Sequence, residues 1–290
     1  MTTLDQLATR GAARSPDRPA IVVPGGGTLR YAELDAAASR FAGALVARGA
    51  APGDRLVLGN GNTPAFFVAL LGAARAGLVA VPLDPGLAPA ELNTVVRHAG
   101  PHAVVVDARS APRFAALGAP LVTVPEAIDA GAAAPARAVD GDAPALILYT
   151  SGTTGTPRGA VHSHAGILSK LDAIRAWFDL GETDRTLCLL PTHFGHGLVA
   201  SCLSALNYGG TLVLCRPFDV ELLPRVFALA DEHEVTTFSS VPTIVRLLLR
   251  NQAIAPPARG RLRFVTCASA PLHPEDAAAF EARFGVPLLN

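Results

Sequence analysis

Residues 146–161 read LILYTSGTTGTPRGAV, and this stretch decides the fold and the function that the sequence predicts. An apolar run leads directly into glycines and hydroxyl side chains, and one cation, Arg158, follows them. Glycine lets backbone N–H groups approach a ligand closely, and hydroxyl groups add further donors. Because many donors and one cation without an acid suit a charge spread over several oxygens, the stretch predicts a polyphosphate site. A glycine-rich surface turn is the simpler alternative.

The spacing of the loop excludes the commoner phosphate-binding motifs. A Walker A loop requires Gly, four residues and then Gly-Lys-Ser/Thr, but the fifth residues after Gly152 and Gly155 are Pro157 and Ala160. No Gly-x-Gly-x-x-Gly sequence follows a predicted strand either. A phosphate site here must therefore be of another class.

The stretch closely resembles the signature loop of the adenylate-forming superfamily, which includes acyl-CoA synthetases, luciferases and nonribosomal peptide adenylation domains. The family pattern is Tyr/Thr-Ser-Gly-Thr-Thr-Gly-x-Pro-Lys-Gly, so Arg158 replaces a lysine. The resemblance implies that the loop holds the β- and γ-phosphates of ATP. It also implies that Arg158 and Thr154 are catalytic, with Arg158 neutralising charge on the departing pyrophosphate. The implied ATP-binding residues here are Thr150, Ser151, Gly152, Thr153, Thr154, Gly155 and Arg158.

Two later segments resemble the same family. The first, residues 190–198, reads LPTHFGHGL and is similar to a Leu-Pro-x-Phe-His-x-x-Gly segment beside the carboxylate being activated, although His-Phe replaces Phe-His here. The resemblance implies that His193, Phe194, His196 and Gly197 bind the substrate. The alternative is that Phe194 lies in the core and both histidines lie at the surface.

The second segment, residues 268–272, reads ASAPL and is similar to the family turn Ser-Gly-x-Ala-Pro-Leu, which borders the adenine and the acyl pocket. The resemblance implies that Ser269, Ala270 and Pro271 bind ATP. Ala268 stands where the family usually has glycine, so it places a methyl group where the backbone would otherwise approach the ligand.

The pattern along the whole chain is that of an α/β protein. Short apolar runs alternate with helical patterns, which is typical of a mostly parallel sheet. Thr63, which is followed by proline, predicts a capped helix that ends at Gly77. The resemblance implies two intertwined βα-layered subdomains of an adenylate-forming N-terminal domain over residues 1–290, incomplete at the C-terminus. Subdomain seams are expected near residues 129–144, which are rich in Ala, Gly, Pro and Asp, and near residue 185.

The composition predicts a cytoplasmic protein without a nucleic-acid or membrane partner. The formal net charge is zero, so no surface for an anionic polymer or bilayer is indicated. The N-terminal residues lack an apolar signal segment, and no apolar run is long enough to span a bilayer. The four cysteines have no C-x-x-C spacing, which indicates buried free thiols in a reducing compartment.

Four histidines near the predicted site, His162, His164, His193 and His196, suggest a metal site. However, no cysteine or carboxylate stands at ligand spacing, and residues two apart on a helix do not face together. We therefore expect no metal ligand in this chain. We expect His162 and His164 to form local hydrogen bonds at the start of a helix.

The implied reaction is the ATP-dependent activation of a carboxylic acid, in fatty-acid or aromatic-acid metabolism, to an acyl-adenylate. Thioester formation follows, with CoA as the expected acceptor, as in an AMP-forming acid–thiol ligase. In the family the chain continues into a Tyr-Gly-x-Thr-Glu motif, a ribose-binding Asp and a small C-terminal lid domain with a catalytic Lys. The main Mg²⁺ ligand is accordingly expected beyond residue 290, and the chain is expected to be an N-terminal portion that a further segment completes.

Two other functions stay open. A non-catalytic nucleotide- or acyl-binding module is favoured by those missing motifs and by the departures at Arg158, Phe194 and Ala268. A serine hydrolase is disfavoured because Tyr149, not glycine, stands two residues before Ser151, so the Gly-x-Ser-x-Gly elbow is missing.

Overall fold

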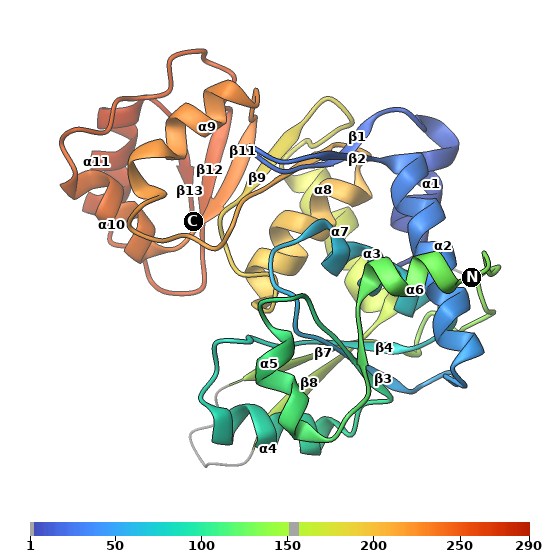
Figure 1. The fold of residues 1–290 in the computed structure, drawn as a ribbon. Coiled ribbons are helices and arrows are strands. Elements are labelled where there is room, and N and C mark those ends of the chain that lie inside the picture. The colour runs from blue at the N-terminus through green and yellow to red at the C-terminus, as the bar shows by residue number, and fades with distance from the viewer. Residues whose placement is uncertain (1–2, 151–156) are drawn as a thin grey trace. The chain divides into compact units, whose positions relative to one another are not determined.

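The computed structural model describes residues 3–150 and 157–290, and it divides into two compact α/β units (Figure 1). Unit 1 contains the chain up to Arg18 together with Arg30–Ala173, and unit 2 contains Pro19–Leu29 together with Ile174–Asn290. The chain therefore enters unit 2 briefly and returns to unit 1 before unit 2 is completed. Each unit is built on its own sheet of mostly parallel strands, which confirms the predicted fold class.

Unit 1 contains a six-stranded sheet in the order β6-β5-β3-β4-β7-β8. The strands β3 to β7 are parallel to their neighbours, whereas β8 is antiparallel to β7. Parallel strands are usually covered on both faces, and all four residues of β4 are accordingly buried. The strands are β3 (Arg55–Leu58), β4 (Val79–Pro82), β5 (Ala103–Val105), β6 (Leu121–Val122), β7 (Pro144–Thr150) and β8 (Arg158–Ser163).

One helix of unit 1, α3 (Pro64–Ala76), begins and ends where local chemistry requires. The side-chain oxygen of Thr63 accepts a hydrogen bond from the N–H of Phe66 at 3.2 Å, and Gly77 ends the helix with a φ of 76°, so the predicted cap and stop are confirmed. The helices of unit 1 are α1 (Gln6–Arg14), α2 (Tyr31–Ala47), α3 (Pro64–Ala76), α4 (Pro89–Ala99), α5 (Ala111–Phe114), the 3₁₀ turn η1 (Ala115–Leu117), α6 (Val124–Ala130) and α7 (His164–Trp177), whose last turn belongs to unit 2.

The strand β8 was not predicted. Its sequence contains one β-branched residue and is largely exposed, so its strand conformation comes from pairing with β7, where Ile147 faces Val161. Gly159 is needed for this pairing, because a Cβ there would lie 2.6 Å from Cγ2 of Ile147. The pairing brings the backbone of Arg158 opposite that of Thr150.

The expected seam near residues 129–144 lies inside unit 1, and the expected seam near residue 185 lies inside unit 2. The first of these segments has almost no large apolar side chains of its own, but backbone hydrogen bonds attach it to helices α2 and α3. Ala134 donates to the carbonyl of Ser39 at 3.3 Å, and Arg137 donates to the carbonyl of Arg75 at 2.9 Å. Its composition therefore marks an extended connection along the unit's surface.

Unit 2 contains a seven-stranded sheet in the order β13-β12-β11-β9-β10-β1-β2. Its strands are β1 (Pro19–Val22), β2 (Thr28–Arg30), β9 (Arg185–Cys188), β10 (Thr211–Leu214), β11 (Thr237–Ser240), β12 (Phe264–Cys267) and β13 (Leu288–Leu289). Its helices are the π-helical segment η2 (His196–Leu203), α8 (Ser204–Asn207), the 3₁₀ turn η3 (Leu223–Arg225), α9 (Val226–Glu232), α10 (Pro242–Arg250) and α11 (Pro274–Phe284). The helical residues 223–232 are divided between η3 and α9, because Pro224 has no N–H to donate.

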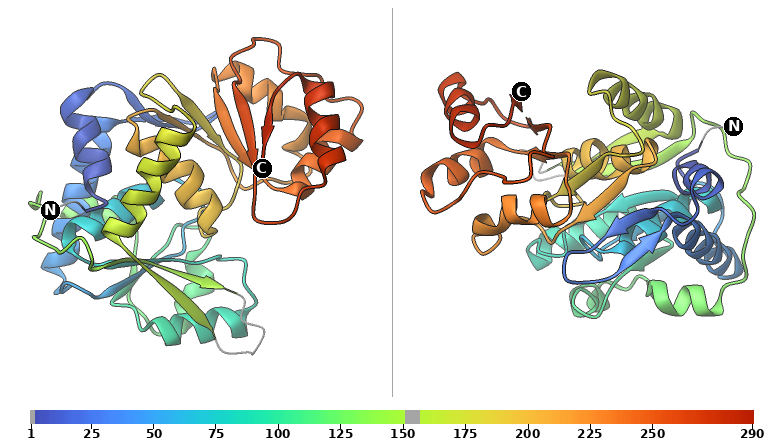
Figure 2. Two further views of the ribbon diagram at one scale, coloured as in Figure 1. Left: turned by 180° about the vertical axis from the view of Figure 1, so that it is seen from behind. Right: turned by 90° about the horizontal axis from the view of Figure 1, so that it is seen from above.

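The main core of unit 2 lies on one face of this sheet, where α9, α10 and α11 pack (Figure 2). The ring of Phe227 lies 4.7 Å from that of Phe284, which in turn lies 4.9 Å from that of Phe280. Phe238 of β11 and Val265 of β12 supply the sheet side of this core. Because side chains alternate along a strand, the intervening residues of β11 and β12 face the other way.

His164, the first residue of α7, is completely buried in unit 1. Its Nδ1 accepts a hydrogen bond from the N–H of Leu4 at 3.2 Å, and its Nε2 has no partner in the described part of the chain. The expectation of a local hydrogen bond is therefore wrong for His164, because the partner is 160 positions away. Burial lowers the pKa of His164, and the nearby charge of Asp5 opposes this only in part.

The buried imidazole predicts a loss of stability in mild acid. Above the ordinary histidine pKa of about 6.5 the ring is neutral in both states, so its contribution is constant. Below that pH the unfolded chain takes up a proton before the folded chain does, so the free energy of unfolding falls, by up to about 1.4 kcal/mol per pH unit. His164→Asn keeps an acceptor for Leu4 but does not titrate. Urea unfolding in neutral and mildly acidic buffers should therefore show a smaller loss for this variant than for the wild type.

His273→Asn, which removes an exposed histidine, provides the matched control for the loss of an imidazole in general. Equal acid losses in His164→Asn and the wild type would contradict the role assigned to burial of His164.

Candidate functional site

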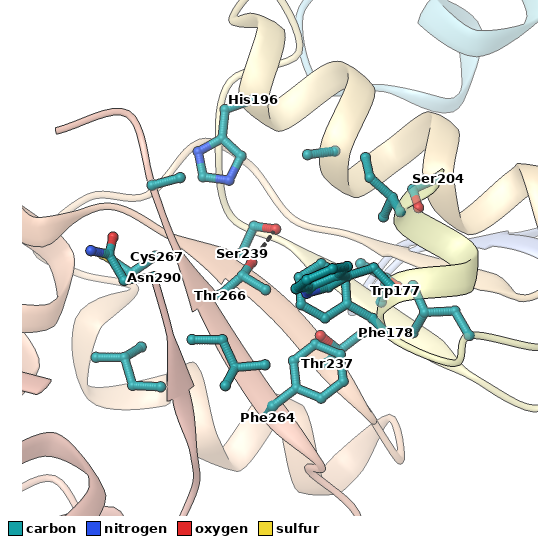
Figure 3. A pocket seen from close by; sticks show the side chains of 17 residues that line it. Trp177, Phe178, His196, Ser204, Thr237, Ser239, Phe264, Thr266, Cys267 and Asn290 are labelled. Atoms are coloured by element: carbon teal, nitrogen blue, oxygen red, sulfur yellow. Dashed lines mark hydrogen bonds between the residues drawn. The ribbon is translucent and has the colours of Figure 1, made fainter. Parts of the chain in front are cut away.

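A cavity of about 480 Å³ lies in unit 2 on the face of the sheet opposite the α9–α11 core (Figure 3). The strands β9, β11 and β12 form one wall, and the end of α7 together with η2 and α8 forms the other. This volume lies within the range of small-molecule sites in proteins, roughly 300 to 1,000 Å³. The cavity is therefore large enough for a small organic acid.

Hydroxyl side chains form much of the sheet wall. Thr237 and Ser239 of β11 stand opposite Phe264 and Thr266 of β12, and Thr237 also stands opposite Thr186 of β9. Three of these four hydroxyls already have partners: Thr266 donates to Ser239 at 2.9 Å, and Thr186 shares a hydrogen bond with the buried Tyr208. The strands thus supply a polar but uncharged surface.

Three aromatic side chains line the same cavity. Phe178, just after α7, stacks on Phe264 of β12 with ring centres 5.2 Å apart and planes inclined by 27°. Trp177 is 84% exposed although it lines the cavity, so its indole stands beside the opening. Figure 3 shows Trp177, Phe178 and Phe264 gathered at one side and His196 at the other. A flat apolar group can pack against this side.

His196, at the start of η2, links two of the segments that the sequence indicated. Its Nδ1 lies 3.0 Å from Oγ of Ser269, in the 268–272 turn. Burial lowers the pKa of His196, so the ring is neutral at pH 7 and can keep its proton on Nε2 while Nδ1 accepts from the serine hydroxyl. Ser269 has a φ of 74°, in the left-handed region that serine rarely adopts. Strained residues of this kind cluster at functional sites, as do π-helical segments such as η2.

The other predicted residues of segments 190–198 and 268–272 differ in how far they are exposed. Phe194 is 41% exposed, so the alternative that it belongs to the core is wrong. His193 is half-buried, whereas Ala270 and Pro271 are exposed. Gly197 is buried, and a Cβ there would lie 2.5 Å from the carbonyl oxygen of Pro191, so packing within the loop accounts for this glycine. Binding by these residues stays a prediction.

The predicted phosphate residues belong to unit 1. Arg158 is exposed at the first position of β8, and no ion pair joins it to any residue in the ranges 3–150 and 157–290. Thr150 ends β7. The other predicted phosphate-binding residues, Ser151, Gly152, Thr153, Thr154 and Gly155, lie outside the described residues.

The sequence did not indicate the hydroxyl side chains of the sheet wall. A partial signal was present in β11 and β12, where Thr237 and Ser239 flank Phe238, and Thr266 follows Val265. Such alternation indicates one polar and one apolar face of a strand. It does not show that the polar face lines a cavity, because that depends on helices distant in the sequence.

Three further properties bear on function. Where the chain is described, no group of three or more His, Cys, Asp or Glu side chains could hold a metal ion. No helix among those residues is long and apolar enough to cross a membrane. All four cysteines are buried and free, as predicted, and burial raises the pKa of Cys267, in the cavity wall, to about 11. This thiol is therefore protonated at pH 7.

Comparison with known proteins now identifies the family. The chain matches the AMP-binding enzyme family over residues 8–290. It belongs to that family. The resemblance drawn from the three sequence segments is thereby confirmed for almost the whole chain.

Curated members of this AMP-binding family include several CoA ligases. Sulfoacetate–CoA ligase of Cupriavidus necator is 34% identical, and the match covers 99% of this chain and 58% of that protein. The 3-hydroxybenzoate–CoA/4-hydroxybenzoate–CoA ligase of Thauera aromatica is 29% identical, with the same coverage of both chains. This chain thus spans less than two thirds of the length of these relatives.

Solved structures of family members share the fold. The inhibitor-bound N-terminal domain of FACL13 from Mycobacterium tuberculosis has a TM-score of 0.88 and 29% identity, over 99% of this chain and 75% of that chain. ATP-bound MatB from Rhodopseudomonas palustris has a TM-score of 0.87 and 29% identity, over 99% of this chain and 59% of that chain.

The exposure of Phe194 leads to a prediction about stability. We expect Phe194→Ala to change the free energy of unfolding by less than about 1 kcal/mol, because little apolar surface is lost from a packed interior. Phe227→Ala, in the core of unit 2, should cost about 3 to 5 kcal/mol. Urea unfolding followed by far-UV circular dichroism measures both losses. A large loss for Phe194→Ala would show that its ring is buried.

The strained Ser269 leads to a prediction that separates its backbone from its hydroxyl. Ser269→Ala and Ser269→Gly both remove the bond to His196, so in both variants ¹⁵N NMR should show a weaker preference for the Nε2–H tautomer. Only glycine relieves the positive φ, so the glycine variant should be the more stable of the two by about 1 kcal/mol. An unchanged tautomer in both variants would mean that Ser269 does not orient the ring.

Proposed function

We propose that this chain binds ATP and a carboxylic acid and, as part of an AMP-forming acid–thiol ligase, converts them to an acyl-adenylate. The observation that carries the proposal is the cavity of unit 2, whose wall contains His196, hydrogen-bonded to the 268–272 turn. Both segments resemble family segments assigned to the carboxylate and to the nucleotide. Membership of the AMP-binding family and the CoA ligases among its relatives support the same reaction.

The reaction proceeds in two displacements. A carboxylate oxygen forms a bond to the α-phosphorus of ATP, and the bond between that phosphorus and the bridging oxygen breaks, so pyrophosphate leaves with the electron pair. The sulfur of a thiol, for which CoA is our proposed acceptor, then attacks the acyl carbon. AMP leaves with its electron pair, and the thiol proton passes to solvent or a base.

We assign the cavity to the acid and the β7–β8 hairpin to the phosphates. His193, Phe194, His196 and Gly197 are the proposed acid-binding residues, and the neutral ring of His196 offers its Nε2–H as a hydrogen-bond donor. Ser269, Ala270 and Pro271 are proposed to contact the nucleotide.

In the hairpin we assign ATP binding to Thr150, Ser151, Gly152, Thr153, Thr154, Gly155 and Arg158, with Thr154 and Arg158 acting in catalysis. An exposed guanidinium without an ion-pair partner among the described residues is available to an incoming anion. Its fork is larger than the lysine ammonium and is always charged, so the sign is kept while the geometry differs.

The proposal assigns no step to a metal held by the described residues, because they offer no ligand cluster. Magnesium, if it accompanies ATP, must find its protein ligands elsewhere, and we place them in the part of the family pattern that follows residue 290. We further propose that a segment corresponding to the rest of the relatives' length completes the enzyme. Four buried free thiols support a reducing, cytoplasmic location.

A second candidate is a non-catalytic binding module. The methyl group of Ala268 favours it, because this exposed residue lines the cavity at a position where the family pattern has glycine. Such a module would bind nucleotide or acid but form no adenylate, so an assay of the chemical step distinguishes the two candidates.

Arg158 provides the test of the chemical step. If its charge stabilises departing pyrophosphate, it acts more strongly in the transition state than in the bound state, so Arg158→Ala should reduce turnover more than ATP affinity. In a protein completed with the segment beyond residue 290, acid-dependent exchange of pyrophosphate into ATP should fall roughly 10²- to 10³-fold. Arg158→Lys should restore most of the exchange, because lysine is the residue of the family pattern.

Arg97→Ala is the matched control, since it removes an exposed arginine of unit 1 in α4 and should leave exchange unchanged. The 290-residue chain alone should bind nucleotide weakly and show no exchange. Rapid pyrophosphate exchange by that chain, or an unchanged exchange rate in the Arg158→Ala enzyme, would contradict the role assigned to Arg158.

A further inference from the structure

The described side chains that line the cavity of unit 2 include no Asp, Glu, Lys or Arg. His196 is the one lining residue among them that titrates near neutral pH, and burial holds its pKa below the ordinary range, so it adds no charge at pH 7. An anionic group that enters a partly enclosed site must be paired, because losing its hydration without a partner costs several kcal/mol. The cavity can accept the reacting carboxylate at its opening, but it has no cation for a second anionic group.

The aromatic side of the cavity favours a flat body. Phe178 and Phe264 stack with their planes nearly aligned, and Trp177 stands exposed beside them (Figure 3). A planar ring packs against such faces with more contact than a flexible chain, and aromatic pairs gain energy beyond the area that they bury.

One hydroxyl oxygen in the wall is fully buried and lacks a partner among the described residues. Ser204, the first residue of α8, is 2% exposed and lines the cavity, yet its Oγ makes no hydrogen bond to any residue that the structure describes. On the sheet wall, by contrast, Thr186 and Thr266 already have side-chain partners. A buried hydroxyl without a partner is costly, so a ligand that supplies one gains affinity over a ligand that does not.

We propose that this cavity selects a hydroxylated aromatic acid: a carboxylic acid whose body is flat, carries no second charge, and bears a hydroxyl that pairs with Ser204. The inference rests on the proposed function, because it takes the cavity to be the site of the acid. Sulfoacetate, the acid in the name of the Cupriavidus necator ligase, carries a second anionic group, which would have no cation among these lining residues. The proposal therefore predicts that this cavity does not select sulfoacetate.

Five ring acids of matched shape test the proposal on the 290-residue chain. They are benzoate, 3-hydroxybenzoate, 4-hydroxybenzoate, isophthalate and terephthalate. Calorimetric titration measures each Kd, and the emission of Trp177, the only tryptophan, reports whether binding occurs at this cavity. One of the two hydroxybenzoates should bind roughly two- to tenfold more tightly than benzoate, as expected for one added hydrogen bond. Both dicarboxylates should bind at least about tenfold more weakly than benzoate.

Two serine variants show whether the hydroxyl preference arises in the cavity. Ser204→Ala should abolish the advantage of the hydroxybenzoate while leaving the Kd of benzoate within about twofold. Ser201→Ala is the matched control, because Ser201 is also buried and also lacks a partner for its Oγ among the described residues, but it does not line the cavity. It should leave the advantage intact.

The results that would overturn the proposal are specific. Terephthalate, isophthalate or sulfoacetate binding as tightly as benzoate would do so, as would a hydroxyl advantage that survives Ser204→Ala, or no binding of any ring acid. Failure of the proposed function is a separate result. If the ring acids bind in the stated order but no acid supports pyrophosphate exchange in the completed protein, the selectivity stands and adenylate formation does not.

Discussion

The alternation of side chains along β11 and β12 is the constraint on which unit 2 depends. Phe238 and Val265 point into the core under α9–α11, and the residues between them, Ser239 and Thr266, point into the cavity. A shift of register by one residue would exchange the two faces, taking Phe238 and Val265 out of the core. Because the core face buries these large apolar side chains, their burial fixes the register, and the register in turn determines which side chains line the cavity.

The hydrogen bond between His196 and Ser269 adds a second constraint, because it ties the start of η2 to the turn after β12. Both segments follow strands of the same sheet at their carboxyl ends, where α/β folds usually hold ligands. The left-handed conformation of Ser269 costs conformational energy, and glycine would avoid that cost. Keeping serine there makes sense if its hydroxyl orients the imidazole, since a neutral histidine is useful only when the correct nitrogen carries the proton.

Local signals in the sequence predicted much of the fold. Thr63 and Gly77 mark the ends of α3, because caps act within a few residues. The strand β8 was missed because its conformation comes from pairing with β7. The bond from His164 to Leu4 was missed because it joins residues that only the fold brings together. Motif resemblance pointed to His196 and Ser269, but the cavity walls depend on helices and strands far apart in the sequence, so no local pattern indicated them.

The two units also divide the electrostatic demands of the proposed reaction. Pyrophosphate carries several charges away, so its site needs a cation, and we propose that Arg158 provides it. The acid carries only the charge that the reaction consumes, since its carboxylate becomes the uncharged acyl end of a mixed anhydride in the adenylate. A cation fixed deep in the acyl cavity would stabilise the free carboxylate more than the adenylate and would thereby oppose the first step. An uncharged cavity with a neutral imidazole in its wall avoids this penalty, and selection among acids then depends on shape and on individual hydrogen bonds.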